Sequence, residues 1–197
     1  MSTDLGDPPL VLQLQPVVQL SDEQFFELAQ LNRDLRVERT ARGELILALP
    51  TGGETGQRNS EITMQLALWA KADGRGITFD SSTGFHLPNA AMRSPDASWV
   101  AKARLAALTD EQRQKFLPLC PDFVIELRSP ADRLSVLREK MQEYLDNGAQ
   151  LGLLLDPEQR RVYVYRAGAE VEELTGPETV SAEPVLPGFI LDLREIW

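Results

Sequence analysis

Ser94-Pro95-Asp96-Ala97-Ser98-Trp99-Val100 is one of the two most informative stretches of this chain. The other is Phe123-Val124-Ile125-Glu126-Leu127-Arg128-Ser129. Each carries a lone acid, Asp96 or Glu126, in an apolar, strand-like setting. A core strand normally avoids carboxylates, because burying an unpaired one is costly. Two such strands indicate that the acids share a partner, for which a divalent cation is the obvious candidate.

Length and composition limit what the chain can be. At 197 residues it fits one domain with a core of useful size. No apolar run approaches the roughly 20 residues that cross a bilayer, and the N-terminus lacks the pattern of an export signal. The single cysteine, Cys120, excludes an internal disulfide and a cysteine-based zinc site. We therefore expect a cytoplasmic protein that does not associate with membranes.

The charge of the chain is acidic. Its net charge of −10 weighs against a large, sequence-independent DNA-binding surface, which is normally basic. It does not exclude an enzyme that acts on nucleic acid, because a metal site concentrates carboxylates. A protein with a negative net charge can also carry a local basic groove.

Periodicity and turn residues predict a mixed α/β fold built on one sheet. Helices are expected from Ser21, whose capping box is completed by Gln24, within 54–72, over 102–117 and from about 132 to 147. The strands are expected at 35–39 and 44–49, which form a hairpin, and then at 78–80, 84–88, 95–100, 122–128, 151–155 and 161–166. In the second helix, Met64 and Leu68 lie beside the apolar stripe, so that helix is expected to be buried on most sides.

The strand 122–128 predicts where its acid points. Side chains alternate along a strand, so Val124, Glu126 and Arg128 share one face. If Asp96 lies on a neighbouring strand, its carboxylate converges with that of Glu126. Mg²⁺ suits such a site, because it needs few carboxylates and keeps several waters.

The helix that follows supplies a cation. Lys140 lies just outside the apolar stripe, next to Tyr144, and can lay its stem on the core while its ammonium reaches a strand end. Glu139 and Glu143 fall on the far side and are expected in water. Tyr144 is expected to pack with its hydroxyl directed outward.

These residues resemble a known group of enzymes. Pro95-Asp96 followed by Glu126-Leu127-Arg128 is similar to the PD-(D/E)XK nuclease superfamily, with arginine where its last lysine usually stands. The chain resembles most the Uma-type, restriction-endonuclease-like family of that superfamily. The likeness extends over most of the chain, through 50–54, 81–85, 94–96, 126–129, 140–144, 147–148 and 155–157.

The resemblance implies an αβββαβ core and Mg²⁺-dependent cleavage of DNA, with Mn²⁺ able to substitute. By position, Asp96 and Glu126 are the implied metal ligands, and Lys140 is the implied catalytic lysine. Glu54 matches an extra acid near the metal in many members. Arg128 departs from the pattern: it can hold a phosphate but cannot readily act as a base. The implied unit is one nuclease-like domain over 1–197, with an N-terminal helix and hairpin (1–50), a core (51–160) and C-terminal strands (161–197).

Several alternatives stay open at this stage. Arg128 could only neutralise Glu126, and Glu54 could be a first-turn residue favoured by the helix dipole. Asp156 reads as a turn residue before Pro157, and Asp122 as an exposed strand start. The only histidine, His86, reads as packing or surface, which excludes a histidine-based metallohydrolase.

The function has alternatives as well. An inactive nuclease fold that binds DNA or regulates is the second hypothesis, motivated by the acidic charge and by Arg128. Cleavage of RNA or a nucleotide is the third. A homodimer or higher homo-oligomer is expected from the function, because two sites suit double-strand cleavage.

Overall fold

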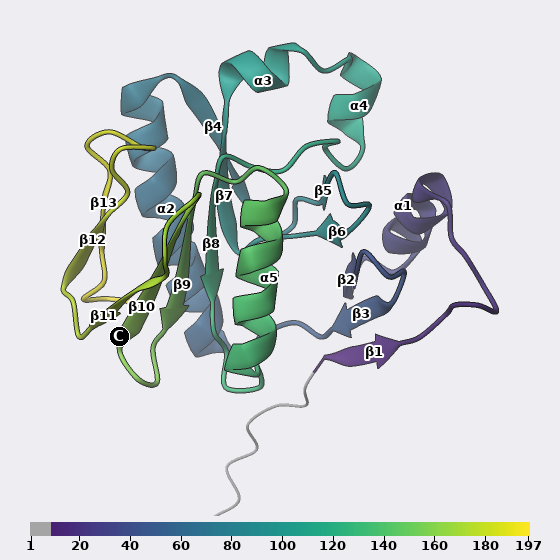
Figure 1. The fold of residues 1–197 in the computed structure, drawn as a ribbon, viewed down its shortest axis with the longest axis horizontal. Coiled ribbons are helices and arrows are strands. Elements are labelled where there is room, and N and C mark those ends of the chain that lie inside the picture. The colour runs from purple at the N-terminus through teal and green to yellow at the C-terminus, as the bar shows by residue number, and fades with distance from the viewer. Residues whose placement is uncertain (1–8) are drawn as a thin grey trace, which may run out of the picture.

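A six-stranded mixed sheet lies at the centre of the computed structural model, which describes residues 9–197 (Figure 1). The strands, in spatial order, are β11 (Glu172–Thr175), β10 (Arg161–Arg166), β9 (Leu151–Asp156), β8 (Phe123–Leu127), β7 (Ala97–Ala101) and β4 (Gly76–Asp80). Only β8 and β9 pair in parallel, and the other neighbours are antiparallel.

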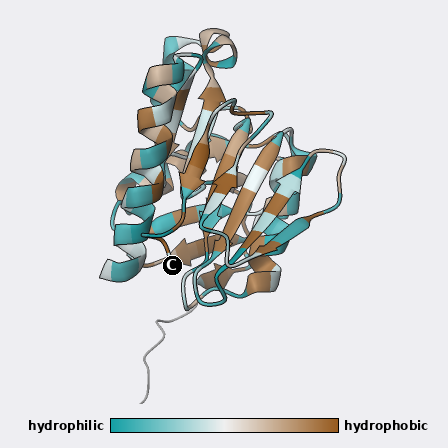
Figure 2. Cartoon of the chain, turned by 90° about the vertical axis from the view of Figure 1, so that its left-hand side faces the viewer, coloured by the Kyte–Doolittle hydropathy of each residue, from teal (hydrophilic) through white to brown (hydrophobic). Residues whose placement is uncertain are grey.

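Two helices cover opposite faces of this sheet. The helix α2 (Gly53–Asp73) buries Ile62 and Leu66 against one face, and α5 (Leu134–Asp146) buries Leu137 and Met141 against the other. Figure 2 shows the hydrophobic residues concentrated on the strands, with α2 presenting a hydrophilic outer side. Read along the chain, α2, β4, β7, β8, α5 and β9 form the αβββαβ core that the sequence predicts.

The parallel pair explains why β8 and β9 are so apolar. Helices cover both faces of a parallel pair, so its strands are buried on both sides, and every residue of β8 and β9 is buried. Two acids lie in these strands, Glu126 in β8 and Asp156 at the end of β9. Both therefore require internal partners.

A second sheet, which the sequence does not predict, is formed largely by the N-terminal third of the chain. Its strands, in spatial order, are β1 (Leu10–Leu12), β3 (Leu45–Ala48), β2 (Arg36–Arg39), β6 (Met92–Arg93) and β5 (Phe85–His86). The predicted hairpin is present as β2 and β3, which turn at Gly43 with a φ of 81°. The helix α1 (Asp22–Leu31) packs Phe25 on this sheet and carries the predicted Ser21–Gln24 capping box.

The remaining elements are short. The predicted 102–117 segment forms two helices, α3 (Lys102–Ala106) and α4 (Asp110–Gln114). The strands β12 (Thr179–Ser181) and β13 (Ile190–Asp192) pair with each other and pack the tail against α2. No helix among residues 9–197 is long and apolar enough to cross a membrane.

Two expectations about burial are wrong. Met64 and Leu68 of α2 are 47% and 61% exposed, because only one face of this helix meets the sheet. Asp122 is buried rather than exposed. It accepts hydrogen bonds from the Ala101 amide, Arg104 and Gln150, and so joins the starts of β8 and β9 to the end of β7.

Candidate active site

The register of β7 and β8 brings the two predicted acids together. Ala97 pairs with Ile125, so Asp96, one residue earlier, continues the ladder opposite Glu126. Side chains directly opposite in an antiparallel pair point to the same face and lie close together. Asp96 Oδ2 also accepts from the Leu127 amide at 2.8 Å. Both acids are nearly fully buried, on the face of the sheet that α5 covers.

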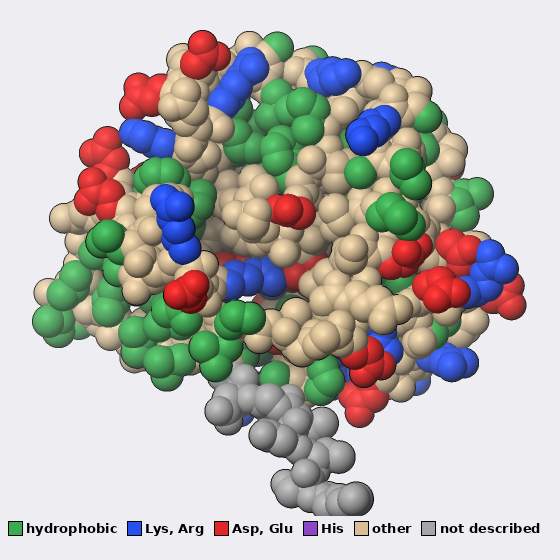
Figure 3. Space-filling model, turned by 180° about the vertical axis from the view of Figure 1, so that it is seen from behind, with side chains coloured by type: hydrophobic (Ala, Val, Ile, Leu, Met, Phe, Trp, Pro, Cys, Tyr) green, Lys and Arg blue, Asp and Glu red, His purple; other side chains and the backbone are tan. Residues whose placement is uncertain are grey.

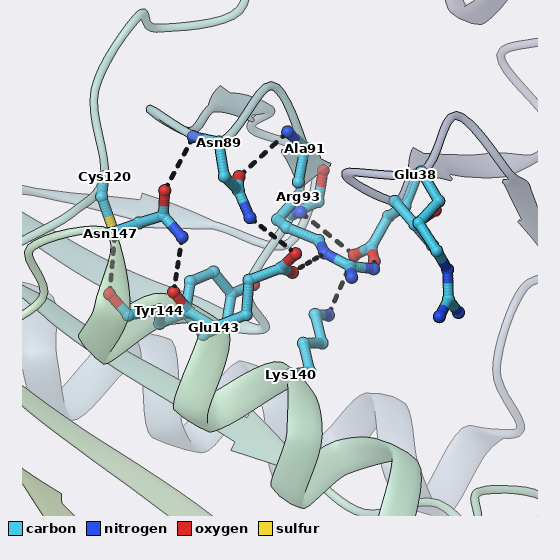
Figure 4. Close-up of polar contacts among 12 residues, drawn as sticks. Glu38, Asn89, Ala91, Arg93, Cys120, Lys140, Glu143, Tyr144 and Asn147 are labelled. Atoms are coloured by element: carbon cyan, nitrogen blue, oxygen red, sulfur yellow. Dashed lines mark hydrogen bonds and ion pairs between the residues drawn. The ribbon is translucent and has the colours of Figure 1, made fainter.

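Lys140 reaches this pair from the middle of α5. Its Nζ lies 2.8 Å from Glu126 Oε1 and 2.9 Å from Glu38 Oε1. Only 10% of its side chain is exposed, so the ammonium lies between helix and sheet, at the position that the helical periodicity predicts. Figure 4 shows Lys140 rising from α5 towards Glu38.

Glu38 is a member of the site that the sequence does not reveal. It comes from β2 of the N-terminal sheet and is buried. Its carboxylate accepts from the Ser94 amide at 3.0 Å and from Arg93 at 3.2 Å, in addition to Lys140. Because Ser94 immediately precedes Pro95 and Asp96, Glu38 fixes the chain where it enters β7.

Arg36, two residues before Glu38 on the same strand, completes the charged cluster. Its Nη1 donates to Asp96 Oδ1 at 2.8 Å, and its Nη2 donates to the Ser94 carbonyl. One third of its side chain is exposed. The site therefore contains three acids, Glu38, Asp96 and Glu126, each of which contacts a cation.

A second layer of polar contacts supports the cluster on the α5 side. Arg93 Nε donates to Glu143 at 2.6 Å, and Asn89 donates to the same carboxylate at 2.9 Å (Figure 4). Tyr144 donates its hydroxyl to Glu126 Oε1 at 2.9 Å. Two expectations are therefore wrong. Glu143 is covered by Arg93 and Asn89 rather than left in water. The Tyr144 hydroxyl points inward because it faces Glu126 on the central sheet.

The surroundings shift the pKa values of Glu38 and Glu126 in opposite directions. Burial disfavours the charged form of Glu38, but Lys140, Arg93 and Arg36 outweigh it and lower its pKa from 4.5 to about 2. At Glu126, burial has the largest effect and repulsion from Asp96 adds to it. Together they outweigh the attraction of Lys140, and the pKa of Glu126 rises from 4.5 to about 7. Burial alone would lower the pKa of Lys140, but Glu126 and Glu38 raise it, so Lys140 stays protonated.

These shifts predict a pH dependence of stability. Between about pH 4.5 and 7, Glu126 holds a proton in the folded protein that it releases in the unfolded chain. Its contribution to the free energy of unfolding is therefore fully present below pH 4.5 and is lost as the pH rises through 7. At about 1.4 kcal/mol per pKa unit, the loss amounts to about 3 kcal/mol. Urea unfolding of wild type and Glu126→Gln across this range measures it. The difference between the two free energies of unfolding should change by that amount, whereas parallel curves would contradict the shift.

Two predicted site residues lie apart from the cluster. Glu54, in the first turn of α2, is exposed and pairs with Arg58 at 2.8 Å. Arg128 pairs at 2.8 Å with Asp156, which is fully buried. Asp156 also begins the predicted turn between β9 and β10, where it accepts a hydrogen bond from the Gln159 amide. The structure thus brings Asp96, Glu126 and Lys140 together and gives Glu54 and Arg128 other partners.

The donor set fits a small hard cation. No group of three or more histidine, cysteine or acidic side chains arranged to hold a metal occurs in residues 9–197. Mg²⁺, however, is usually held by one or two carboxylates, with waters and substrate phosphates filling the other positions. Asp96 and Glu126 supply that pair. Figure 3 shows a hollow near the centre of the back face in which basic and acidic side chains lie together.

Comparisons with known proteins agree with this fold. A family model described as "Uma2: Putative restriction endonuclease" matches residues 22–194. A crystal structure described as a putative nuclease belonging to DUF820 from Anabaena variabilis matches with a TM-score of 0.74 and 19% sequence identity. The match covers 90% of this chain and 97% of that one, and at this identity it establishes the fold alone. No curated protein matches the chain.

Proposed function

The chain belongs to the Uma2 family, and we propose that it is a Mg²⁺-dependent endonuclease that hydrolyses phosphodiester bonds in DNA. The observation that carries the proposal is the convergence of Asp96, Glu126 and Lys140 from two strands and a helix. A fold does not establish a function by itself, and the chemistry of these three side chains is what supports a nuclease.

Asp96 and Glu126 are the proposed metal ligands, with Mn²⁺ able to replace Mg²⁺. A metal bound there would polarise the attacking water and offset the charge of the phosphate. Binding would also favour the ionised form of Glu126, because a divalent cation opposes the effect of burial on that carboxyl.

Lys140 is proposed to act as a cation and not as a base. Its raised pKa keeps the ammonium and its three N–H donors, two of which contact Glu38 and Glu126, so that one remains for a water or a phosphate oxygen. Glu38 and Glu126 hold the ammonium beside the metal ligands, where it can orient a water or stabilise charge that grows on the phosphate. Preorganised donors of this kind need little rearrangement during the reaction.

The geometry assigns Glu54 and Arg128 lesser roles in this proposal. Arg128 is held by Asp156 and by the Asp132 carbonyl, which favours a structural role at the end of β8. Glu54 is exposed on α2 and pairs with Arg58, so its contacts do not support the predicted approach to the metal.

A cleavage assay tests the proposal. The purified protein should cut plasmid or linear duplex DNA in millimolar Mg²⁺ or Mn²⁺, and excess EDTA should abolish the cutting. Single-stranded DNA, RNA and nucleotides belong in the same assay, because the metal chemistry alone does not select DNA. Absence of both cleavage and Asp96-dependent Mn²⁺ binding would contradict the proposal.

One observation favours a second candidate, a nuclease fold that binds DNA without cutting it. Arg36 and Lys140 occupy the carboxylates that a metal needs. Tight DNA binding without metal-dependent turnover would support this candidate over the first.

A further inference from the structure

Arg36 occupies the carboxylate that the proposed metal must use. Its guanidinium bonds to Asp96 Oδ1, while Asp96 Oδ2 is already held by the Leu127 amide. A cation can therefore bind Oδ1 fully only if Arg36 withdraws.

Arg36 is also the member of the cluster best placed to move. Its side chain is 33% exposed, whereas those of Glu38, Asp96, Glu126 and Lys140 are at most 10% exposed. Its Nε finds no hydrogen-bond partner among the described residues, so the guanidinium is only partly satisfied where it lies. Withdrawal into solvent would release it without opening the core.

The exchange would keep Asp96 neutralised, because Arg36 is the cation that contacts it. Glu38, Asp96 and Glu126 lie close to one another, and Arg36 contributes one positive charge to them. A divalent cation would supply two charges in the same place. The guanidinium that it releases is permanently charged and forks in a geometry that matches a phosphate.

We propose that Arg36 is an exchangeable counter-ion: it neutralises Asp96 while the metal is absent, and when the metal binds it swings out to hold a phosphate of the nucleic acid. This inference rests on the proposed function of the same site. It makes Arg36 a substrate-binding residue supplied by the N-terminal sheet to a core that otherwise contains the metal ligands.

Isothermal titration with MnCl₂ tests the first half. Arg36→Gln should bind Mn²⁺ at least about tenfold more tightly than wild type, because one competing charge-assisted contact is gone. Arg42→Gln is the matched control: Arg42 lies on the same hairpin, is 83% exposed and pairs with Glu44, so its removal should leave the affinity unchanged. If Arg36→Gln does not fold, Arg36→Lys, which keeps the charge but loses the fork, should show a smaller gain.

Fluorescence anisotropy of a labelled DNA duplex tests the second half. In Ca²⁺, chosen to limit turnover, Arg36→Gln should bind the duplex several-fold more weakly although it binds the metal more tightly. Opposite changes in the two affinities are not expected from a structural role alone. Mn²⁺ binding that depends on Asp96 but is not tightened in Arg36→Gln would overturn this inference and leave the proposed function standing. Failure of all variants to bind Mn²⁺ would overturn both.

Discussion

Asp96→Asn and Glu126→Gln are each expected to lower the metal-dependent cleavage rate by about a thousandfold or more. Each change removes one of the two carboxylates proposed to hold the metal, and loss of transition-state stabilisation by about 4 kcal/mol corresponds to that factor. Neither change alters the size of the side chain, but each removes one charge of a buried ion pair, with Arg36 or Lys140, so some loss of stability is expected. The rate is measured on the DNA substrate found in the cleavage assay, at saturating Mn²⁺.

Glu139→Gln is the control for these two variants. Glu139 precedes Lys140 on α5, is exposed and has no role in the cluster, so its rate should match wild type. Circular dichroism and thermal unfolding would confirm that all variants are folded. Wild-type rates in folded Asp96→Asn or Glu126→Gln would remove the metal site from the mechanism.

Lys140→Met is expected to destabilise the protein by about 3–5 kcal/mol. The ammonium is the shared partner of Glu38 and Glu126, and removal of one member of a buried ion pair leaves uncompensated charge in the core. Part of the cost will be relieved by protonation of Glu126, whose pKa is already raised to about 7. The penalty should therefore grow as the pH rises above 7. Urea unfolding at pH 6 and pH 8 measures both effects.

Two further variants distinguish the effect of breaking the buried ion cluster from the effect of removing any lysine. Lys115→Met removes an exposed lysine that pairs with Glu111, and such pairs contribute about 0–1 kcal/mol. Lys140→Met combined with Glu126→Gln should recover part of the loss, because the second change removes an unpaired carboxylate. Equal effects of Lys140→Met and Lys115→Met would show that the buried cluster does not stabilise the fold.

The sequence predicts the core of the site because that core depends on local rules. Strand alternation places Glu126 on one face of β8, and helical periodicity places Lys140 beside the apolar stripe of α5. Asp96 follows from its strand-like context next to Pro95. Periodic segments predict a mixed α/β domain, and the αβββαβ order is what the resemblance to the nuclease family implies.

The outer members of the site depend on contacts that no local rule describes. Glu38 meets Lys140 across 102 residues of sequence, and Arg36 meets Asp96 across 60. The alternation of β2 does not reveal that Arg36 and Glu38 face the central sheet and α5. The expectations for Glu143 and Tyr144 are wrong for a similar reason, since a helical wheel identifies the faces of α5 but not the partners that meet them.

The burial of Asp122 and Asp156 depends on distant contacts as well. Asp122 begins a strand and Asp156 begins a turn, as predicted, yet both are buried because Arg104 and Arg128 cover them. Each arginine comes from a segment whose path depends on the whole fold. The sequence therefore does not reveal which distant arginine pairs with each acid.

A crystal structure determined in millimolar Mn²⁺ would test the proposed metal site itself. We expect an anomalous difference peak bound by the carboxylates of Asp96 and Glu126, with the guanidinium of Arg36 moved away from Asp96. A structure in which this position stays empty, with the Arg36–Asp96 contact intact while Mn²⁺ binds elsewhere on the molecule, would contradict it.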